Sequence, residues 1–292
     1  MQQADSRAGV LAPPFRCDIL GAVVDVAAPD GEPLLWLQWA LSGFLIADDT
    51  TASVARYALA RDERNGWILT RDDAVLRMDG DLATAVLALE WQLVTDAMER
   101  RDDLFHLHGA ALATPDGAAT LLVVGVSGSG KTTLTLGLMA AGFCPFGDDV
   151  VFLDPASLAL LPLRRAFHVR APTRALVSLP GDDAPWADAT GTRWFLPPRW
   201  ASPPSPPIAA IVFPEVQADA APALTPLTPA EGAHRLLSHS VTLNNSPALA
   251  LSSVRALIAQ ATCYRLVVGE PAATVAMVRA LVSPAGHERC AP

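Results

Sequence analysis

The residues with the clearest chemistry lie in one short stretch, where positions 120–133 read TLLVVGVSGSGKTT. This stretch matches the pattern GxxxxGK[ST] in full, from Gly125 to Thr132. The apolar residues before the match are typical of a buried parallel strand, and residues 131–141 are typical of a helix. A strand, a glycine-rich loop and a helix in this order predict a phosphate site, because the loop N–H groups and the helix N-terminus point at the anion.

Lys131 is the only lysine in the chain, which has twenty arginines. A compact ammonium on a flexible stem reaches the β- and γ-phosphates inside such a loop, whereas a planar guanidinium is a poor substitute. The hydroxyl of Thr132 is suited to Mg²⁺. The residues predicted to contact a nucleotide are Gly125, Val126, Ser127, Gly128, Ser129, Gly130, Lys131, Thr132 and Thr133.

Two adjacent carboxylates, Asp148 and Asp149, precede the apolar strand predicted over 150–153. Neighbouring carboxylates repel each other and are costly to bury without a cation. One of them could hold Mg²⁺ while the other takes the proton of an attacking hydroxyl. Asp154, at the far end of the same strand, is a rival metal ligand, and the direction of the strand does not decide between the two ends.

Upstream, residues 105–113 read as a strand, Pro115-Asp-Gly117 as a turn and residues 120–124 as the next strand. This pattern predicts a hairpin. His106 and His108 share one face of the first strand because side chains alternate along it. Two histidines on one face beside the loop strand favour a functional role for this pair.

The order of these motifs resembles the catalytic domain of HPr kinase/phosphorylase. The resemblance is specific over 104–154 and looser over 80–103 and 155–282. The chain as a whole is similar to the shorter HPr kinase-related proteins of some peptide-modification gene clusters. The matching residues are His108-Gly109, the loop from Gly125 to Thr132, Gly142 and Gly147-Asp148-Asp149.

The resemblance implies an α/β fold with a P-loop kinase core of the HPr kinase C-terminal type. It implies transfer of the γ-phosphate of ATP, with Mg²⁺, to a Ser or Thr hydroxyl of a protein or peptide. His108 would then belong to the phosphate pocket, with Lys131 on the nucleotide and Thr132 on Mg²⁺. Asp148 and Asp149 would supply a metal contact and the base; we favour Asp149 as the base and leave their order open. The hexamers of the family imply a homo-oligomer.

This chain departs from the family at two places. Thr132-Thr133 stand where the family usually has Ser, often followed by an acidic residue. A later Glu-x-Arg-Gly signature, which serves dephosphorylation and HPr docking in the family, has no match. We therefore do not extend the resemblance to phosphorylase activity or to HPr as the acceptor.

Composition sets the outer limits on function. With 292 residues, 51% of them apolar and 17% charged, the chain can bury a large core and is not expected to be disordered. The net charge of −9 argues against nucleic acid and anionic membranes as partners. We find no signal peptide and no transmembrane run, and the four scattered cysteines predict neither a zinc site nor a disulfide framework. A cytoplasmic protein is expected.

The rest of the chain is predicted to position this site. Residues 1–80 read as a small β-rich region with some helix near 51–61, residues 81–282 as the P-loop domain and residues 283–292 as a flexible tail. A helix capped by Asp81 should run to Arg100-Arg101. Strands and helices alternate after residue 208, which is typical of an α/β sheet. The proline-dense residues 196–207 form either a lid or a stiff connector.

Four arginines lie between positions 164 and 174. Arginines beside a nucleotide site could stabilise transferring phosphate groups, or this run could be a solvated basic strand. The matching region of the related proteins leads into substrate contacts, so the resemblance favours Arg170 for a role on phosphate. Two other functions stay open at this point: a kinase for a small-molecule hydroxyl, and a non-catalytic nucleotide-binding accessory protein of a peptide-modification system. The choice of ATP over GTP comes from the resemblance alone.

Overall fold

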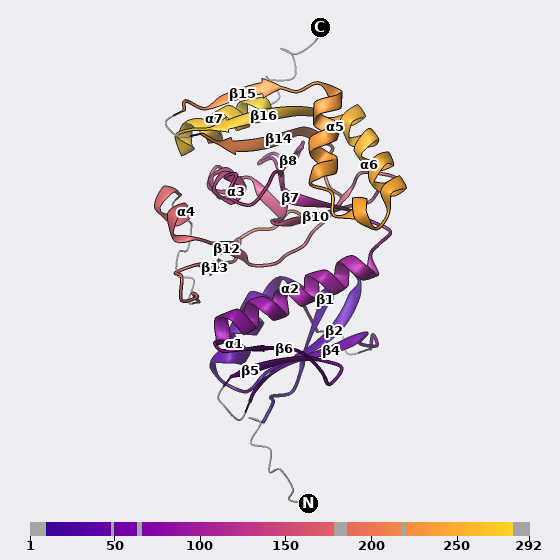
Figure 1. The fold of residues 1–292 in the computed structure, drawn as a ribbon, viewed down its shortest axis with the longest axis vertical. Coiled ribbons are helices and arrows are strands. Elements are labelled where there is room, and N and C mark those ends of the chain that lie inside the picture. The colour runs from indigo at the N-terminus through magenta and orange to yellow at the C-terminus, as the bar shows by residue number, and fades with distance from the viewer. Residues whose placement is uncertain (1–9, 48–49, 63–65, 178–185, 218–219, 283–292) are drawn as a thin grey trace, which may run out of the picture. The chain divides into compact units, whose positions relative to one another are not determined.

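In the computed structural model the chain is a mixed α/β protein (Figure 1). The structure describes residues 10–47, 50–62, 66–177, 186–217 and 220–282, so the predicted tail lies outside the described residues. Its contacts divide the chain into two compact units. The first comprises Met1–Arg101, Arg164–His168 and Ala184–Leu196, and the second Asp102–Leu163, Val169–Asp183 and Pro197–Pro292.

The first unit is built on a six-stranded sheet, in the order β3-β1-β2-β4-β5-β6. All its neighbouring strands are antiparallel except β2 and β4. This confirms the predicted β-rich character of the N-terminal region. The elements are β1 (Phe15–Ile19), β2 (Ala22–Ala27), α1 (Glu32–Ala40), the 3-10 helix η1 (Ser42–Phe44), β3 (Leu45–Ile46), β4 (Ala55–Arg61), β5 (Trp67–Arg71), β6 (Ala74–Asp79) and α2 (Leu82–Arg100).

Helix α2 begins as predicted, with the Asp81 carboxylate accepting a hydrogen bond of 2.9 Å from the Thr84 N–H. Its buried positions, among them Val86, Leu89 and Leu93, follow helical spacing. The helix contacts β4, β5 and β6 of the sheet. The structure therefore counts α2 with the first unit, whereas the sequence assigned residue 81 onward to the P-loop domain.

The helix expected near 51–61 is wrong, because residues 55–61 form the inner strand β4 between β2 and β5. Tyr57 and Leu59 are fully buried at alternate positions, the spacing of a strand. The helix of this region is instead α1, where Pro33 lies in the first turn and Trp36, Leu37 and Ala40 are buried.

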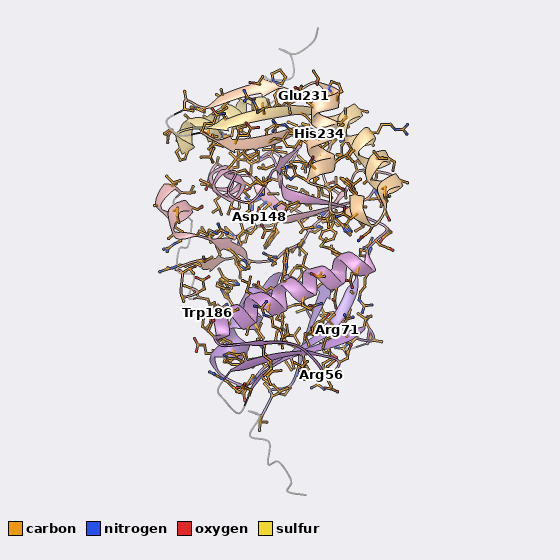
Figure 2. All side chains as sticks on the ribbon, in the orientation of Figure 1. Arg56, Arg71, Asp148, Trp186, Glu231 and His234 are labelled. Carbon is orange, nitrogen blue, oxygen red and sulfur yellow. The ribbon has the colours of Figure 1, made fainter. Side chains whose placement is uncertain are left out.

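A buried polar contact joins α2 to the sheet. The Asp96 carboxylate of α2 forms an ion pair with the Arg71 guanidinium of β5 at 2.8 Å. Arg71 is labelled in Figure 2. The Tyr57 hydroxyl donates to the same carboxylate. Burial and the neighbouring Asp96 both raise the pKa of Tyr57, so this hydroxyl stays protonated at neutral pH.

Two short segments of the middle of the chain return to the first unit. β12 (Phe167–Val169) pairs with β13 (Arg193–Phe195) in a two-stranded sheet. Glu90 of α2, almost fully buried, accepts hydrogen bonds from Trp194 Nε1 at 2.7 Å and from His168 Nε2 at 3.0 Å. These contacts anchor the segments on either side of helix α4, which itself belongs to the second unit.

The second unit is built on a mixed sheet in the order β11-β10-β7-β8-β14-β16-β15, with β9 also pairing with β7. Strands β8, β14 and β16 are parallel to one another. The elements are β7 (Phe105–Ala113), β8 (Thr120–Val124), α3 (Lys131–Ala140), β9 (Cys144–Gly147), β10 (Val150–Leu153), β11 (Leu160–Leu161), α4 (Ala171–Leu176), β14 (Ile208–Val216), β15 (Ala223–Pro226), α5 (Pro229–Ser238), η2 (Thr242–Asn244), α6 (Pro247–Gln260), β16 (Thr262–Val268) and α7 (Pro271–Leu281).

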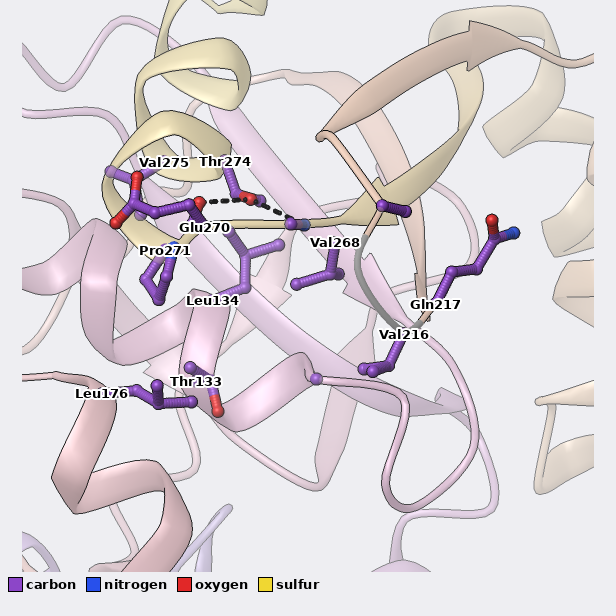
Figure 3. A pocket seen from close by; sticks show the side chains of 13 residues that line it. Thr133, Leu134, Leu176, Val216, Gln217, Val268, Glu270, Pro271, Thr274 and Val275 are labelled. Carbon is purple, nitrogen blue, oxygen red and sulfur yellow. Dashed lines mark hydrogen bonds between the residues drawn. The ribbon is translucent and has the colours of Figure 1, made fainter.

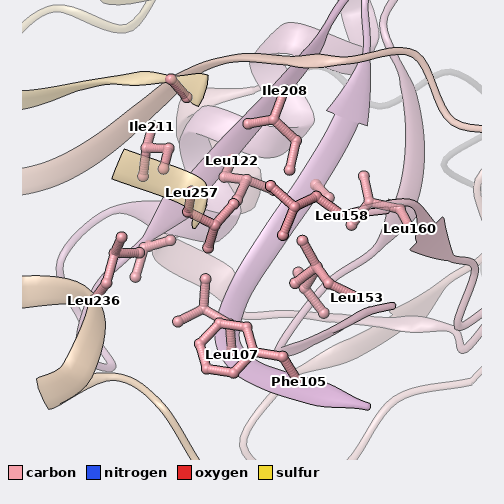
Figure 4. Close-up of a cluster of buried hydrophobic side chains, with 14 of the residues drawn as sticks. Phe105, Leu107, Leu122, Leu153, Leu158, Leu160, Ile208, Ile211, Leu236 and Leu257 are labelled. Atoms are coloured by element: carbon pink, nitrogen blue, oxygen red, sulfur yellow. The ribbon is translucent and has the colours of Figure 1, made fainter. Parts of the chain in front are cut away.

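Alternate side chains of the central strands are buried on opposite faces of this sheet. Leu122 and Val124 of β8 pack in the cluster that contains Leu236 of α5 and Leu257 of α6 (Figure 4). Leu121 and Val123 pack on the other face, with α3 and α7. The predicted hairpin of β7 and β8 is confirmed, with Gly109 opposite Val124 and Ala113 opposite Thr120.

The proline-dense segment contacts the end of the sheet opposite the glycine-rich loop. The Pro207 carbonyl accepts from the Thr120 N–H at 2.8 Å, at the start of β8, whereas the loop follows its end. These contacts favour a connector over a lid at the loop. Among the described residues, no helix has both the length and the apolar character needed to span a membrane.

Candidate functional site

The glycine-rich loop, residues 125–130, joins the end of β8 to the start of α3, and the predicted strand, loop and helix are confirmed. Gly128 and Gly130 have φ angles of +83° and +96°, a region that residues with a Cβ rarely adopt. A Cβ on Gly125 would lie 2.8 Å from the Ser129 hydroxyl, so the loop closes tightly on itself. The spacing of glycines in the motif is thus required by the backbone.

Lys131, only 6% exposed, folds back over this loop. Its Nζ donates to the carbonyls of Gly125 at 2.6 Å and Val126 at 2.9 Å. It also lies 3.3 Å from Nε2 of His108 on the neighbouring strand β7. Burial lowers the pKa of Lys131, and the negative charges of Asp148 and Asp149 oppose that shift.

The carboxylate pair lies where the strand beside β7 is interrupted. β9 and β10 pair in turn with β7, and Asp148 and Asp149 form the break between them. Asp149 has a φ of +67°, and its carbonyl accepts from the Gly109 N–H at 3.2 Å. Because Gly109 faces Val124, this break lies level with the start of the loop.

Asp148 contacts the start of α3. Its Oδ2 lies 3.3 Å from the Thr132 hydroxyl, which donates to it, and the residue is only 8% exposed. Figure 2 labels Asp148 among the side chains of the second unit. The contact brings together the two residues predicted to bind a metal ion, and it joins two segments sixteen positions apart in the chain.

Of the two histidines on β7, only His108 reaches the loop. His106 is buried and packs edge-on against Phe152 at 4.9 Å. Burial lowers the pKa of His108, the Lys131 cation lowers it further, and Asp149 opposes both effects. A neutral His108 can therefore accept a hydrogen bond from the lysine ammonium.

Two further residues near this cluster, His239 and Arg235, could not be found from sequence patterns. The His239 carbonyl at the end of α5 accepts from the His108 N–H at 2.9 Å. Burial lowers the pKa of His239, and electrostatic interactions with His108, Lys131 and Arg235 lower it further. Arg235, one turn earlier on α5, donates to Glu215 near the end of β14 at 2.7 Å. Both contacts join residues far apart in the chain, and one polar residue in or after a helix forms no sequence pattern that predicts such a contact.

Asp154, the rival metal ligand, does not join the cluster. β10 starts level with His108 and runs away from the loop, so Asp154 lies beyond its far end. There Asp154 caps a turn, accepting from the N–H groups of Ala156 and Ser157. We therefore reject the Walker B reading of Asp154.

The four arginines do not act as one group. Arg164 and Arg165 belong to the first unit, and Arg165 lies over the Trp91 ring at 5.5 Å. Arg170 is exposed at the residue before α4, and its carbonyl accepts from the Arg174 N–H at 3.1 Å. Its side chain makes no hydrogen bond or ion pair with another described residue. Its predicted role on phosphate has no support from these contacts.

The described residues of the second unit thus combine a glycine-rich loop at a helix N-terminus, a buried ammonium, a hydroxyl–carboxylate pair and a second carboxylate. This set can hold a polyphosphate and remove a proton from a nearby hydroxyl. No family model and no curated protein matches the chain.

Proposed function

We propose that this chain is an ATP-dependent kinase, similar to HPr kinases, that phosphorylates a Ser or Thr hydroxyl of a protein or peptide. One observation carries the proposal: Lys131, Thr132 and the Asp148–Asp149 break lie together at the end of β8. A glycine-rich loop alone would suit any nucleotide-binding protein. A carboxylate pair level with the loop is what phosphate transfer to a hydroxyl requires in addition.

The loop fits a polyphosphate in two respects. The N-terminus of α3 has no side-chain cap, so its first N–H groups are available to an anion. The Ser129 hydroxyl is buried and has no hydrogen-bond partner among the described residues. Such groups are normally satisfied, so a phosphate oxygen at this position would supply the missing acceptor.

The Thr132–Asp148 pair fits Mg²⁺. Mg²⁺ prefers oxygen ligands and is held by one or two carboxylates together with substrate phosphates. Over the described residues, no three His, Cys, Asp or Glu side chains gather as a separate metal site. Bound Mg²⁺ would neutralise charge on the β- and γ-phosphates. We assign Asp148 to the metal because of its contact with Thr132.

Asp149 then remains for the acceptor. Its carboxylate takes the proton as the acceptor oxygen forms a bond to the γ-phosphorus, and the bond from that phosphorus to the bridging β–γ oxygen breaks. ADP leaves with the electron pair of the broken bond. Lys131 moves from the Gly125 and Val126 carbonyls to the phosphates and stabilises their charge during transfer.

The proposal is tested by single-turnover transfer from γ-labelled ATP with Mg²⁺, using the full chain and separate protein, peptide and small-molecule fractions of its host. We expect label on Ser or Thr of a protein or peptide. Label only on a small molecule would favour the small-molecule kinase. Tight nucleotide binding without any labelled product would favour the accessory protein.

We also expect nucleotide binding to take up a proton at His108. In the free protein burial and Lys131 keep the pKa of His108 below its usual value near 6.5. Bound phosphates favour the protonated ring, so the pKa rises on binding. Between the two pKa values, binding takes up a proton and affinity rises as pH falls.

Calorimetry near pH 6 in buffers of different ionisation enthalpy measures this uptake. His108→Asn should reduce it, and the difference between the two proteins removes the contribution of the nucleotide's own phosphates. Equal uptake in both proteins would contradict a role for His108 beside the phosphates.

A further inference from the structure

A pocket of about 310 Å³ opens beside the glycine-rich loop. It starts at Gly130 and Thr133, where the loop meets α3 (Figure 3). Val216 at the end of β14 and Val268 at the end of β16 form another part of its wall. Leu176 of α4 also lines it, and the Thr173 hydroxyl lies 3.2 Å from that of Thr133, so α4 contacts the first turn of α3.

The position of the pocket follows from the order of strands. β14 and β16 lie on one side of β8, and β7 and β10 lie on the other. Asp148, Asp149 and His108 are on the β7 side of the loop. The pocket is on the β14 side, beyond the carboxyl ends of three parallel strands, where open α/β sheets bind ligands. A nucleotide with its terminal phosphate at the carboxylates therefore extends its other end toward this pocket.

The lining suits a neutral, apolar part of a ligand. Among the described residues that line it, Glu270 alone has an ionisable side chain, and none is a Lys, Arg or His that could hold a second phosphate. Leu176 and Val216 are 57% and 61% exposed, so two large aliphatic side chains remain open to water beside the loop. The volume is at the lower end of the ~300–1,000 Å³ typical of small-molecule sites.

Most polar groups of the wall are already engaged. The Thr274 hydroxyl accepts from the Gly269 N–H at 3.2 Å and donates to the Glu270 carbonyl at 2.9 Å. The Glu270 carboxylate caps α7 through Ala272 and Ala273, and these bonds lower its pKa, so that it stays ionised. Among the described lining residues, the exposed Gln217 amide is the one polar side chain that these bonds leave unengaged. The wall therefore offers mostly area for contact and few hydrogen bonds with which to read a base.

We propose that this pocket receives the base of a purine nucleoside triphosphate and selects it by apolar contact area, with little distinction between adenine and guanine. The inference rests on the proposed function, because it assumes that phosphates occupy the loop. Purines are preferred over pyrimidines since the larger ring system removes more apolar surface from water.

Calorimetric binding of inorganic triphosphate, ATP, GTP, CTP and UTP, each with Mg²⁺, tests the proposal on the full chain. We expect ATP and GTP to bind about ten-fold or more tighter than triphosphate and within about three-fold of each other, with CTP and UTP between them and triphosphate. The double variant Leu176→Asn with Val216→Asn should weaken ATP and GTP about ten-fold and leave triphosphate unchanged. Both positions are exposed, so the fold should tolerate the change, and Leu251→Asn on α6, also exposed, is the matched control.

The outcomes separate this inference from the proposed function. If triphosphate binds and the nucleotides bind no tighter, or if the double variant changes nothing, the pocket does not hold the base and the kinase proposal stands. A preference for ATP over GTP of more than about ten-fold would show a base-reading contact and overturn selection by area. If neither triphosphate nor ATP binds, both proposals fail.

Discussion

Replacing Lys131 with alanine should lower the rate of phosphate transfer about 10²–10³-fold, the usual cost of losing one charged or hydrogen-bonding group that stabilises a transition state. In the free protein the lysine ammonium is held by two loop carbonyls and lies beside His108, so it needs only a short movement to reach phosphates on the loop. Single-turnover transfer and nucleotide binding should both be measured, because this lysine contributes to each.

Lys131→Arg is the sharper variant, since it keeps the charge and changes only the shape. The Lys131 ammonium occupies a space bounded by carbonyls at 2.6 and 2.9 Å, and the residue is 6% exposed. A planar guanidinium does not fit there without moving the loop, and overpacking of this kind costs about 1–3 kcal/mol. We expect Lys131→Arg to be nearly as impaired in transfer as Lys131→Ala.

Arg255→Lys provides the reverse exchange at an exposed position of α6 and should leave transfer unchanged. Thermal unfolding of all three variants separates loss of the site from loss of the fold. Full activity in Lys131→Arg would mean that the loop needs only a positive charge. The presence of a single lysine among so many arginines would then have no explanation in this site.

The sequence could predict the parts of the site that are local in the chain. The strand, loop and helix of the proposed phosphate site span only about twenty residues, and the glycines with positive φ mark the turns directly. The β7–β8 hairpin is equally local, because a short turn fixes its register. Asp148 could be assigned to the same site because only one helix, α3, separates it from the loop in the chain.

Contacts that depend on long-range pairing could not be predicted. His239 reaches His108 only because the end of α5 meets β7, an arrangement that no local pattern encodes. The same limit applies to the four arginines between positions 164 and 174, which are divided between the two units. Residues 164–168 belong to the first unit, where His168 and Trp194 both contact Glu90. The resemblance favours Arg170 by its position in the chain, and its exposed side chain shows how little that position determines.

The N-terminal region shows a second limit, which comes from the ambiguity of short apolar runs. The segment ARYALAR of β4 contains alanine, leucine and arginine, which favour helices. Pairing with β2 and β5 outweighs that preference, since an inner strand gains hydrogen bonds along both edges. Burial at Tyr57 and Leu59 then follows from the strand.

Asp149→Asn should lower the rate of transfer about 10²–10⁴-fold, the range that a general base contributes. Asparagine is the appropriate replacement because Asp149 has a φ of +67°, which asparagine adopts more readily than most residues with a Cβ. The backbone carbonyl that accepts from Gly109 is kept as well. Nucleotide affinity and the Mg²⁺ requirement should therefore change little while the rate of transfer falls.

Asp148→Asn is the matched comparison, one residue earlier in the same break. Its side-chain carbonyl can still accept from Thr132, so the local contact survives, but the negative charge that favours Mg²⁺ is lost. We expect a higher Mg²⁺ concentration for half-maximal transfer, with part of the rate recovered at saturating metal. Titrating Mg²⁺ against both variants thus separates a base from a metal ligand. If Asp149→Asn is the variant rescued by metal and Asp148→Asn is not, the two roles must be exchanged, because only a defect in metal binding is overcome by mass action.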